Sequence, residues 1–562
     1  MKDLNVVIAG AAGEGVQTVG DTLAAAVSAQ GYAVSTWKEY ESRIRGGLNS
    51  YSVRVGEEPR NAPLEEADVL LALNRSAVDK YEKRLKPEGT LLFGEALEGR
   101  RMAAVDFVGI AKDEIGGKIY ANTVAVGALA AVLGMNLDGL KTVLGRVFRD
   151  KSEDVQKKNA KAAEKGYQAA DQACRDACPW TLEWGKGRYL LLTANDAIPL
   201  GAAHAGCRFI SAYPMTPSTG IITMLARERD RLGVFAEQAE DEIAAVNMAI
   251  GASFAGARAM TATSGGGFAL MVEGLSLAGM TETPLVVVLA QRPGPATGLP
   301  TRTGQGELLF AIHAGHGEFP KVVMAPADPQ DAFFKTVRAF NLADRYQTPV
   351  ILLTDQYLAD AKFSVEDLDP ERVPPAFHTA DPSSFPEDGY ARYRITEDGI
   401  SPRLIPGRSK HLVGADSDEH DEHGHITEDL PGTAVPMTKK RLAKLEGLRK
   451  EVHPPEENGM EGSDVVLVGW GSSRTAILEA LELLAQDGVK AGMIHFTELW
   501  PLPEYAFPQN KAHWTVESNA TAQLARLLRS EYGMVFQGHV DRLDGLPLTG
   551  EHIRRTFHER NA

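Results

Sequence analysis

The chain has 562 residues, of which 44% are hydrophobic and 24% charged, so it is long enough for three or four domains of ordinary globular composition. Its 75 acidic residues outnumber its 59 basic ones, and the formal net charge of −16 argues against a nucleic-acid partner. No apolar run is long enough to cross a bilayer and a strand is predicted within a few residues of the start, so we expect a cytoplasmic protein without a signal peptide or membrane anchor.

The first predicted element is a strand that leads through a glycine-rich turn into a helix. The strand covers residues 5–9, Gly13 and Gly15 stand in the turn, and the helix runs from Thr18 to Gln30. This order suits a turn that cradles a phosphate, and it suits a plain tight turn equally well. The next predicted strand, 33–37, leads into Lys38 rather than an acidic residue, which argues against a nicotinamide cofactor.

A loop rich in arginine and glycine follows at residues 41–47, and its composition suits a polyphosphate. Strands predicted at 68–74, 90–94 and 105–110 would complete an α/β domain.

Residues 151–176 are charged and rich in alanine, which predicts a helical connector. Cys174 and Cys178 would share one face of this helix; we interpret them as packing residues, with a metal site as the less favoured alternative. The third cysteine is Cys207, so we expect no disulfide framework. Three thiols also cannot supply the four thiolates of an iron–sulfur cluster.

The stretch from Arg208 to Leu308 carries the most chemical information. Its predicted strands at 209–213, 259–264 and 284–290 run into a turn with two prolines, a triple glycine and a proline-braced arginine loop. Ligands bind at the carboxyl ends of strands in an open parallel sheet, so several polar groups are expected to converge on one crevice: Thr216, Glu240, the glycines 265–267, Arg292 and Thr301.

Three acidic residues precede a helix of small residues. For Asp241 and Glu242, a functional role and a role as carboxylates that favour a helix N-terminus are equally good interpretations. Glu240 follows a predicted strand end, and we therefore predict a functional role for it.

The segment 366–463 holds many prolines and charges and little periodicity, which predicts a long linker. Within it, residues 416–425 contain three histidines among five carboxylates. They form either a metal site or, as we favour, a polar structural loop. From Asp464 onward a strand, a glycine turn and a helix begin a last domain, whose glycines we assign to packing.

Three motifs together resemble the alpha subunit of the 2-oxoacid:ferredoxin oxidoreductases, most closely the 2-oxoglutarate type. They are Tyr-Pro-Met-Thr-Pro-Ser at 213–218, Glu-Asp-Glu at 240–242 and Gln-Arg-Pro-Gly-Pro-Ala-Thr-Gly at 291–298. Methionine replaces the isoleucine usual in the first motif, a change that conserves volume. The resemblance implies an α/β multi-domain fold. Its parts are a Rossmann-like gamma domain (1–185), a thiamine diphosphate pyrimidine-binding domain (186–365), the linker (366–463) and a transketolase C-terminal-like domain (464–562).

The resemblance also implies roles for individual residues. Glu240 would hydrogen-bond the aminopyrimidine of thiamine diphosphate, since a carboxyl buried beside an apolar ring keeps its proton and can donate it. The same cofactor would contact Tyr213, Gly266 and Phe268. The 2-oxoacid carboxylate would be bound by Thr216, Arg292 and Thr301, because a guanidinium pairs with a carboxylate through two parallel hydrogen bonds. Arg302 would bind a second carboxylate or form a surface salt bridge. Coenzyme A would be bound with the help of Gly13, Gly15, Ser42, Arg43, Arg45 and Gly46.

The sequence lacks the Gly-Asp-Gly motif, followed later by asparagine, that usually marks a thiamine diphosphate–magnesium site. A beta subunit would therefore carry Mg²⁺, a [4Fe–4S] cluster and the diphosphate half of the cofactor, in an (αβ)₂ assembly that reduces ferredoxin. The implied reaction is the reversible oxidative decarboxylation of 2-oxoglutarate with coenzyme A to succinyl-CoA and CO₂. Alternatives are the same reaction on pyruvate or a branched-chain 2-oxoacid, a transketolase-type transferase, and a non-catalytic binding module.

Overall fold

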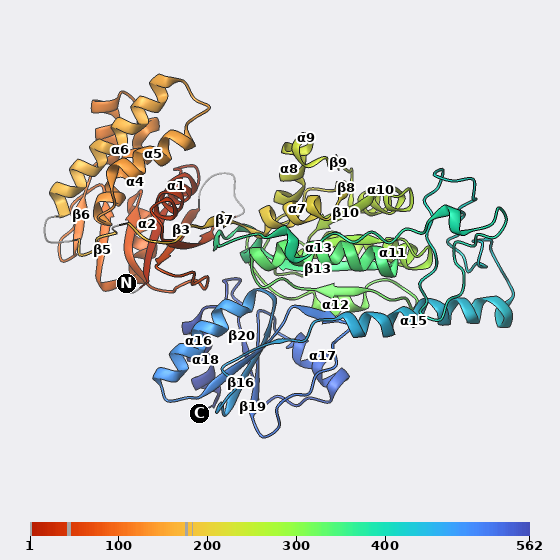
Figure 1. Ribbon diagram of the computed structural model, residues 1–562. Coiled ribbons are helices and arrows are strands. Elements are labelled where there is room, and N and C mark those ends of the chain that lie inside the picture. Colours follow the sequence, from red (N-terminus) through yellow and green to blue (C-terminus); the bar gives the residue numbers. More distant parts are fainter. Residues whose placement is uncertain (1–2, 42–46, 175–177, 183, 562) are drawn as a thin grey trace. The chain divides into compact units, whose positions relative to one another are not determined.

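The structure, a computed structural model, describes residues 3–41, 47–174, 178–182 and 184–561. The chain divides into two compact units, of which the first comprises Met1–Leu192 with Asp360–Asp367 and the second Thr193–Ala359 with Leu368–Ala562. Three sheets form their centres, one in the first unit and two in the second (Figure 1). None of the described helices is both long enough and apolar enough to cross a membrane.

The sheet of the first unit has the strand order β6-β5-β4-β1-β3-β2-β14-β7. Strand β1 runs parallel to β4 but antiparallel to β3, so the sheet is mixed. Its strands are β1 (Leu4–Ala11), β2 (Ala33–Glu39), β3 (Leu48–Gly56), β4 (Ala67–Ala72), β5 (Leu85–Phe93), β6 (Met102–Ala104), β7 (Leu190–Leu192) and β14 (Phe363–Val365). The helices are α1 (Val16–Ala29), α2 (Arg75–Tyr81), α3 (Phe107–Ile110), α4 (Ala121–Val132), α5 (Leu137–Val147) and α6 (Glu153–Cys174).

Two parts of this unit differ from the sequence-based prediction. Strand β3 was not predicted, although it lies between β1 and β2 in the sheet. The segment predicted as a strand at 105–110 instead begins helix α3, because the Asp106 side chain accepts a hydrogen bond from the backbone N–H of Gly109 at 2.8 Å. An aspartate in this position satisfies a free donor of the first helical turn.

The predicted helix at 151–176 is confirmed as α6, but it is a core element rather than a connector. It packs on α4 through two glycines. A Cβ at Gly127 would lie 2.0 Å from the carbonyl oxygen of Ala163, and one at Gly166 would lie 2.0 Å from that of Val124. The two helix backbones therefore approach more closely than any larger residue would permit.

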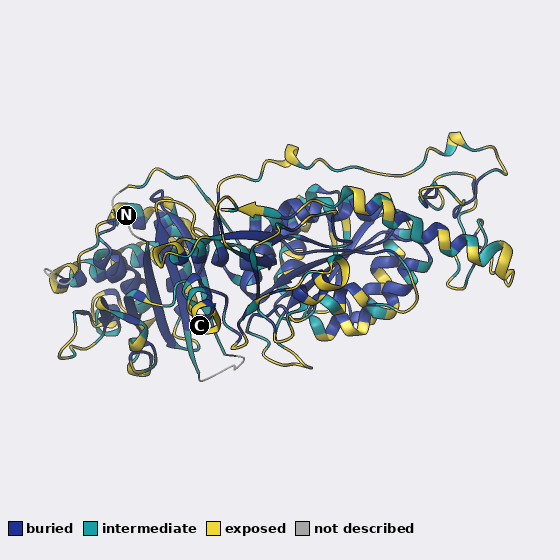
Figure 2. Ribbon diagram, turned by 90° about the horizontal axis from the view of Figure 1, so that it is seen from below, coloured by how far each residue is buried: buried dark blue, intermediate teal, exposed yellow. Residues whose placement is uncertain are grey.

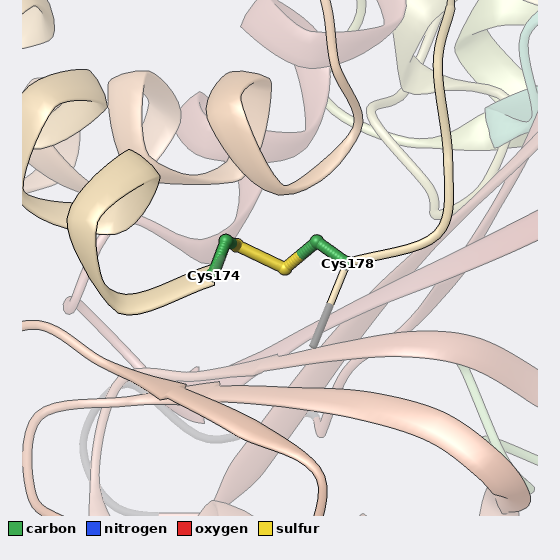
Figure 3. Close-up of a disulfide and its surroundings, with 2 residues drawn as sticks. All are labelled: Cys174 and Cys178. Carbon is green, nitrogen blue, oxygen red and sulfur yellow. A yellow bond between two sulfur atoms is a disulfide. The ribbon is translucent and has the colours of Figure 1, made fainter. Parts of the chain in front are cut away.

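The expectation that Cys174 and Cys178 are unlinked packing residues on one helix face is wrong. Helix α6 ends at Cys174, and the two cysteines form a disulfide with their Cα atoms 5.3 Å apart (Figure 3). This separation lies within the range that a disulfide spans.

The first sheet of the second unit has the order β18-β12-β13-β11-β10-β8-β9, and all neighbours except β18 and β12 are parallel. Its central strands are buried on both faces (Figure 2), as a parallel sheet covered by helices requires. The strands are β8 (Cys207–Ala212), β9 (Phe235–Gln238), β10 (Arg258–Thr263), β11 (Leu285–Gln291), β12 (Val322–Met324), β13 (Pro349–Asp355) and β18 (Glu498–Trp500). The helices are α7 (Ala194–His204), α8 (Thr219–Arg227), α9 (Arg229–Leu232), α10 (Glu242–Phe254), α11 (Gly265–Met280), α12 (Leu308–His313), α13 (Pro329–Tyr346) and α14 (Gln356–Asp360).

The second sheet of this unit has the order β15-β17-β16-β19-β20 and is parallel apart from β15. Its elements are β15 (Glu456–Asn458), β16 (Val465–Trp470), β17 (Ala491–Phe496), β19 (Ala512–Glu517), β20 (Gly538–Asp541), α16 (Arg474–Gln486), α17 (Gln523–Tyr532) and α18 (Gly550–Asn561). Strand β18 follows β17 in the chain but pairs with β12 of the seven-stranded sheet. It therefore connects the two sheets of this unit.

The segment 366–463, predicted as a linker, contains the 17-residue helix α15 (Val435–Glu451). Lys440 and Lys444 of this helix are buried and pair with Glu282, which follows α11. Burial alone would raise the pKa of Glu282, yet Lys444, Lys440 and Arg392 hold it at about 2. The end of this segment is thus fixed to the preceding domain by a buried ionic cluster.

Candidate functional site

The carboxyl ends of β8, β10 and β11 lie at one edge of the seven-stranded sheet. Strand β10 pairs with both of the others in parallel register, so the segments that follow the three strands meet there. These segments are the turn at 213–218, the glycines 265–267 and the loop that begins at Arg292. The sequence predicts ligand binding at this edge of the sheet.

The turn at 213–218 and the arginine loop are directly bonded. The side chain of Arg292 donates a hydrogen bond from Nη1 to the carbonyl oxygen of Thr216, at 2.7 Å. Within the turn, the Ser218 hydroxyl donates to the Met215 carbonyl at 2.8 Å, which stabilises the bend. Partial burial lowers the pKa of Arg292 below its usual value. The guanidinium is therefore held at the strand ends with several donors still available for an anion.

Glu242 is the buried carboxylate of this site. It is 3% exposed, and its Oε1 atom has no hydrogen-bond donor among the described residues. The neighbouring Asp241 caps α10 by accepting from the backbone N–H of Ala244 at 2.7 Å, so Glu242 is not needed as the cap. A Cβ added at Gly267 would lie 2.4 Å from Glu242 Oε1 and 2.1 Å from Thr263 Oγ1. The glycine thus makes room for the carboxylate beside the N-terminus of α11.

Glu240, which the sequence analysis selects, is exposed. The role predicted for it depends on a buried carboxyl beside an apolar ring, and the structure of this chain does not provide that environment at position 240. Glu242 meets the condition two residues later. The sequence is equally compatible with Glu242 as a helix-start carboxylate and as a functional residue, and burial at the start of α10 distinguishes it from Glu240.

A second carboxylate, Glu307, lies beside the first glycine of the run, and the sequence did not predict it. A Cβ at Gly265 would lie 2.6 Å from Glu307 Oε1, and the buried Oε2 has no donor in the described part of the chain. The backbone N–H of Glu307 donates to the Gln291 side chain at 3.0 Å, which ties it to the residue before Arg292. Burial raises the pKa of Glu307 to about 7, with Arg292 acting in the opposite direction.

The remaining predicted cofactor residues lie around the same glycine run. Tyr213 is 40% exposed, and Gly266 has open space where a side chain would stand, its nearest neighbour being the Ala296 carbonyl at 3.9 Å. Phe268 is fully buried and packs edge-on against Phe310, with ring centroids 5.2 Å apart. Gly266 and Tyr213 are therefore open to a ligand, whereas Phe268 supports the site from within the core.

Thr301 and Arg302 are partly buried. The backbone N–H of Arg302 donates to the Leu299 carbonyl at 3.1 Å, and a Cβ at Gly545 would lie 2.8 Å from Arg302 Cβ. The arginine stem thus packs against the C-terminal domain.

The glycine turn after β1 uses positive φ angles at Gly13 (90°) and Gly15 (85°), a region that favours glycine. At Gly15 a Cβ would also lie 1.9 Å from Asn122 Nδ2. Glu14 Oε2 accepts a hydrogen bond from the backbone N–H of Ala11 at 2.8 Å, so one donor of the turn is already satisfied by the chain itself. Ser42, Arg43, Arg45 and Gly46, predicted to contact coenzyme A, lie outside the described residues.

The acidic and histidine-rich loop at 416–425 is anchored through His420. This residue is buried against Tyr393, with ring centroids 4.1 Å apart, and its ring nitrogens contact the carbonyl oxygens of Asp421 and Met280. Glu419 pairs with Arg441 of α15 through two hydrogen bonds of 2.9 and 2.6 Å. These contacts favour the structural interpretation of the loop.

Two protein-family models match the chain. One is described as pyruvate flavodoxin/ferredoxin oxidoreductase, thiamine diphosphate-binding, and covers residues 200–440. The other is described as pyruvate ferredoxin/flavodoxin oxidoreductase and covers residues 5–169.

Individual relatives match over nearly the whole chain. The alpha subunit of 2-oxoacid:ferredoxin oxidoreductase 2 from Aeropyrum pernix is 32% identical, over 98% of this chain and 96% of that one. The 2-oxoglutarate oxidoreductase subunit KorA of Mycobacterium tuberculosis is 30% identical, over 98% and 91%. Among solved structures, the 2-oxoglutarate:ferredoxin oxidoreductase from Magnetococcus marinus, with 2-oxoglutarate, coenzyme A and succinyl-CoA bound, superposes with a TM-score of 0.92. It is 34% identical and covers 100% of both chains.

Proposed function

The chain belongs to the 2-oxoacid:ferredoxin oxidoreductase family as an alpha subunit, and on this premise we propose that it acts on 2-oxoglutarate. The reaction is oxidative decarboxylation with coenzyme A, dependent on thiamine diphosphate, to give succinyl-CoA, CO₂ and reduced ferredoxin. Relatives named for 2-oxoglutarate, and the neighbouring structure with 2-oxoglutarate and coenzyme A bound, support this substrate over pyruvate or a branched-chain 2-oxoacid.

The observation that carries the proposal is the buried carboxylate of Glu242 beside the glycine start of α11. The residues present fit the pyrimidine half of thiamine diphosphate: Glu242 Oε1 has no donor among the described residues, and Gly266, next to the glycine that Glu242 contacts, has open space where a side chain would stand. When bound, the cofactor supplies the electron sink for decarboxylation. The chain's own contribution is the buried carboxyl of Glu242, whose Oε1 would form a hydrogen bond with the ring. Glu240 is the alternative carboxyl, and its exposure argues against it.

For the substrate carboxylate, we assign Arg292 together with Thr216 and Thr301. Arg292 is already oriented by its bond to the Thr216 carbonyl, so little side-chain entropy is lost when it binds an anion. Arg302 is assigned to the distal carboxylate of a dicarboxylic substrate.

For coenzyme A, we assign the first unit, with Gly13, Gly15, Ser42, Arg43, Arg45 and Gly46. Positive charge and backbone donors of this kind suit phosphate groups.

A beta subunit completes the enzyme. The chain has three cysteines, of which two form a disulfide, so a cluster of four thiolates must come from another polypeptide. We assign the [4Fe–4S] cluster, Mg²⁺ and the diphosphate contacts to that subunit, in an (αβ)₂ assembly that reduces ferredoxin.

The test is to purify this chain alone and together with the beta subunit, and to measure acceptor reduction that depends on both 2-oxoglutarate and coenzyme A. Activity should appear only with the complex. Activity of the single chain would overturn the assignment of cluster and Mg²⁺ to a partner. Turnover without coenzyme A, with a sugar phosphate as acceptor, would instead support a transketolase-type transferase.

A further inference from the structure

A cavity of about 330 Å³ lies at the amino ends of β8, β10 and β11. It is bordered by the first residues of these strands, by α13 and by chain from the segment 377–408. The candidate catalytic site lies at the carboxyl ends of the same strands. Strand β10 has six residues, so about 20 Å of strand separates the two ends. The cavity is therefore distinct from the site described above.

Two buried arginines share one carboxylate in the wall of this cavity. Arg258 and Arg403 are 9% and 8% exposed, respectively. Arg258 donates from Nη2 to Asp344 Oδ2 at 3.0 Å, and Arg403 donates from Nη2 to Asp344 Oδ1. The backbone N–H of His378 also donates to Asp344 Oδ2, at 2.9 Å. Two guanidinium groups facing a single carboxylate leave one positive charge in excess, and a buried excess charge is costly unless an anion compensates it.

The hydrogen bonds of these arginines are also incomplete. The Nε atoms of Arg258 and Arg403 are both buried, and neither has an acceptor among the described residues. The other donors of Arg258 reach Asp344, Asn341 and the carbonyl oxygens of Ala205 and Ala376. Burial lowers the pKa of Arg403, and Asp344 offsets only part of this effect.

Two more arginines, Arg208 and Arg408, line the same cavity and are exposed. In the part of the chain that the structure describes, neither forms an ion pair with a carboxylate. Among the described residues that line the cavity, Asp344 is the one acidic side chain, against four arginines. The formal net charge of the whole chain is −16, so this basic cavity stands out against an acidic background.

We propose that this cavity binds a small oxyanion that carries two or more negative charges. Carboxylates and phosphates are both recognised by the planar donor fork of arginine, so the ligand is either a di- or tricarboxylate or a small phosphate compound. Arg208 and Arg408 attract the anion at the entrance, and the pair formed by Arg258 and Arg403 supplies the excess charge that it neutralises. Because the cavity contacts the amino ends of strands whose carboxyl ends form the catalytic site, an anion bound there stabilises the sheet that supports both.

The experiment is calorimetric titration of the purified full-length chain with citrate and, separately, with inorganic phosphate, at constant ionic strength. We expect saturable binding of at least one, and the tighter of the two identifies the ligand as a carboxylate or a phosphate. Arg208→Ala and Arg408→Ala remove exposed side chains, so they should preserve the fold while raising the Kd about tenfold each. Arg403→Gln should abolish binding where it folds.

Arg231→Ala removes an exposed arginine elsewhere and serves as the matched control, with an unchanged Kd expected. Arg292→Ala should also retain binding, which separates this cavity from the oxoacid site. Absence of saturable heat with both anions, or equal affinity in wild type and the Arg208 and Arg408 variants, would overturn the proposal.

Discussion

The carboxylate of Glu242 fills the space that a side chain at position 267 would need, since a Cβ there would come within 2.4 Å of Oε1. Gly267→Ala should therefore displace the carboxylate. In the assembled complex we expect the rate of hydrogen–deuterium exchange at C2 of bound thiamine diphosphate to fall at least about tenfold, because displacing a catalytic group raises the activation barrier. Gly251→Ala, in α10 with nothing within 4 Å of the added methyl, is the control and should exchange at the wild-type rate.

The two glutamates can be separated by a matched pair of variants. Glu242→Gln keeps the shape of the side chain but cannot hold the carboxyl proton, so C2 exchange should fall by about 10²–10⁴-fold while the complex still binds the cofactor. Glu240→Gln changes an exposed side chain and should leave exchange near wild type. The reverse pattern would restore Glu240 as the functional carboxyl and remove Glu242.

Arg292→Ala should impair use of the oxoacid far more than folding. Loss of one partner in a desolvated charge pair costs about 2–5 kcal/mol, so kcat/KM for 2-oxoglutarate should fall accordingly, with the KM for coenzyme A little changed. Arg292→Lys keeps the charge without the planar fork and should recover only part of the loss. Equal losses for both substrates would show that Arg292 does not bind the oxoacid carboxylate.

Glu307 makes the stability of the protein depend on pH. Burial raises its folded pKa to about 7 from 4.5, so between these values the folded state holds a proton that the unfolded chain has lost. The resulting stabilisation is fully present below about pH 4.5 and is lost as the pH rises through 7, on the order of 3 kcal/mol in total. Glu307→Gln lacks this titration.

Denaturant midpoints of wild type and Glu307→Gln, measured at pH 5 and pH 8, provide the test. The denaturant midpoint of wild type should exceed that of Glu307→Gln by more at pH 5 than at pH 8. A constant difference would mean that Glu307 titrates normally.

Glu282→Gln should destabilise the chain by about 3–5 kcal/mol, because it leaves two buried lysines without their carboxylate. The measurement is the denaturant midpoint, with Glu461→Gln, a change at an exposed position, as the control. A midpoint shift no larger than that of the control would show that α15 is held by other contacts.

The edge of the sheet that carries the candidate site could be predicted from the sequence, because strand ends marked by proline and glycine obey local turn chemistry and a general rule of parallel sheets. The choice between Glu240 and Glu242 could not. Both lie in one acidic cluster, and only the packing of α10 against Gly267 buries the second. Glu307 was missed for the same reason, since its environment comes from residues distant in the chain.

Helix α15 was hidden by its composition. From the sequence alone, its lysines are expected to be exposed to solvent. They are buried because Glu282, which lies more than 150 residues earlier in the chain, forms ion pairs with them. The disulfide was likewise obscured by the assumption that the helix continues past Cys174.

Strand β14 has a consequence for the order of folding during synthesis. It inserts between β2 and β7 in the first unit, although some 170 residues of the second unit are made between β7 and β14. Domains made first on the ribosome usually fold first. Here the N-terminal sheet stays incomplete until residue 365 has emerged, and until then β2 and β7 each present an open edge to other chains. A chain truncated within the second unit therefore has an N-terminal domain without β14, and its unpaired strand edges make it prone to aggregation.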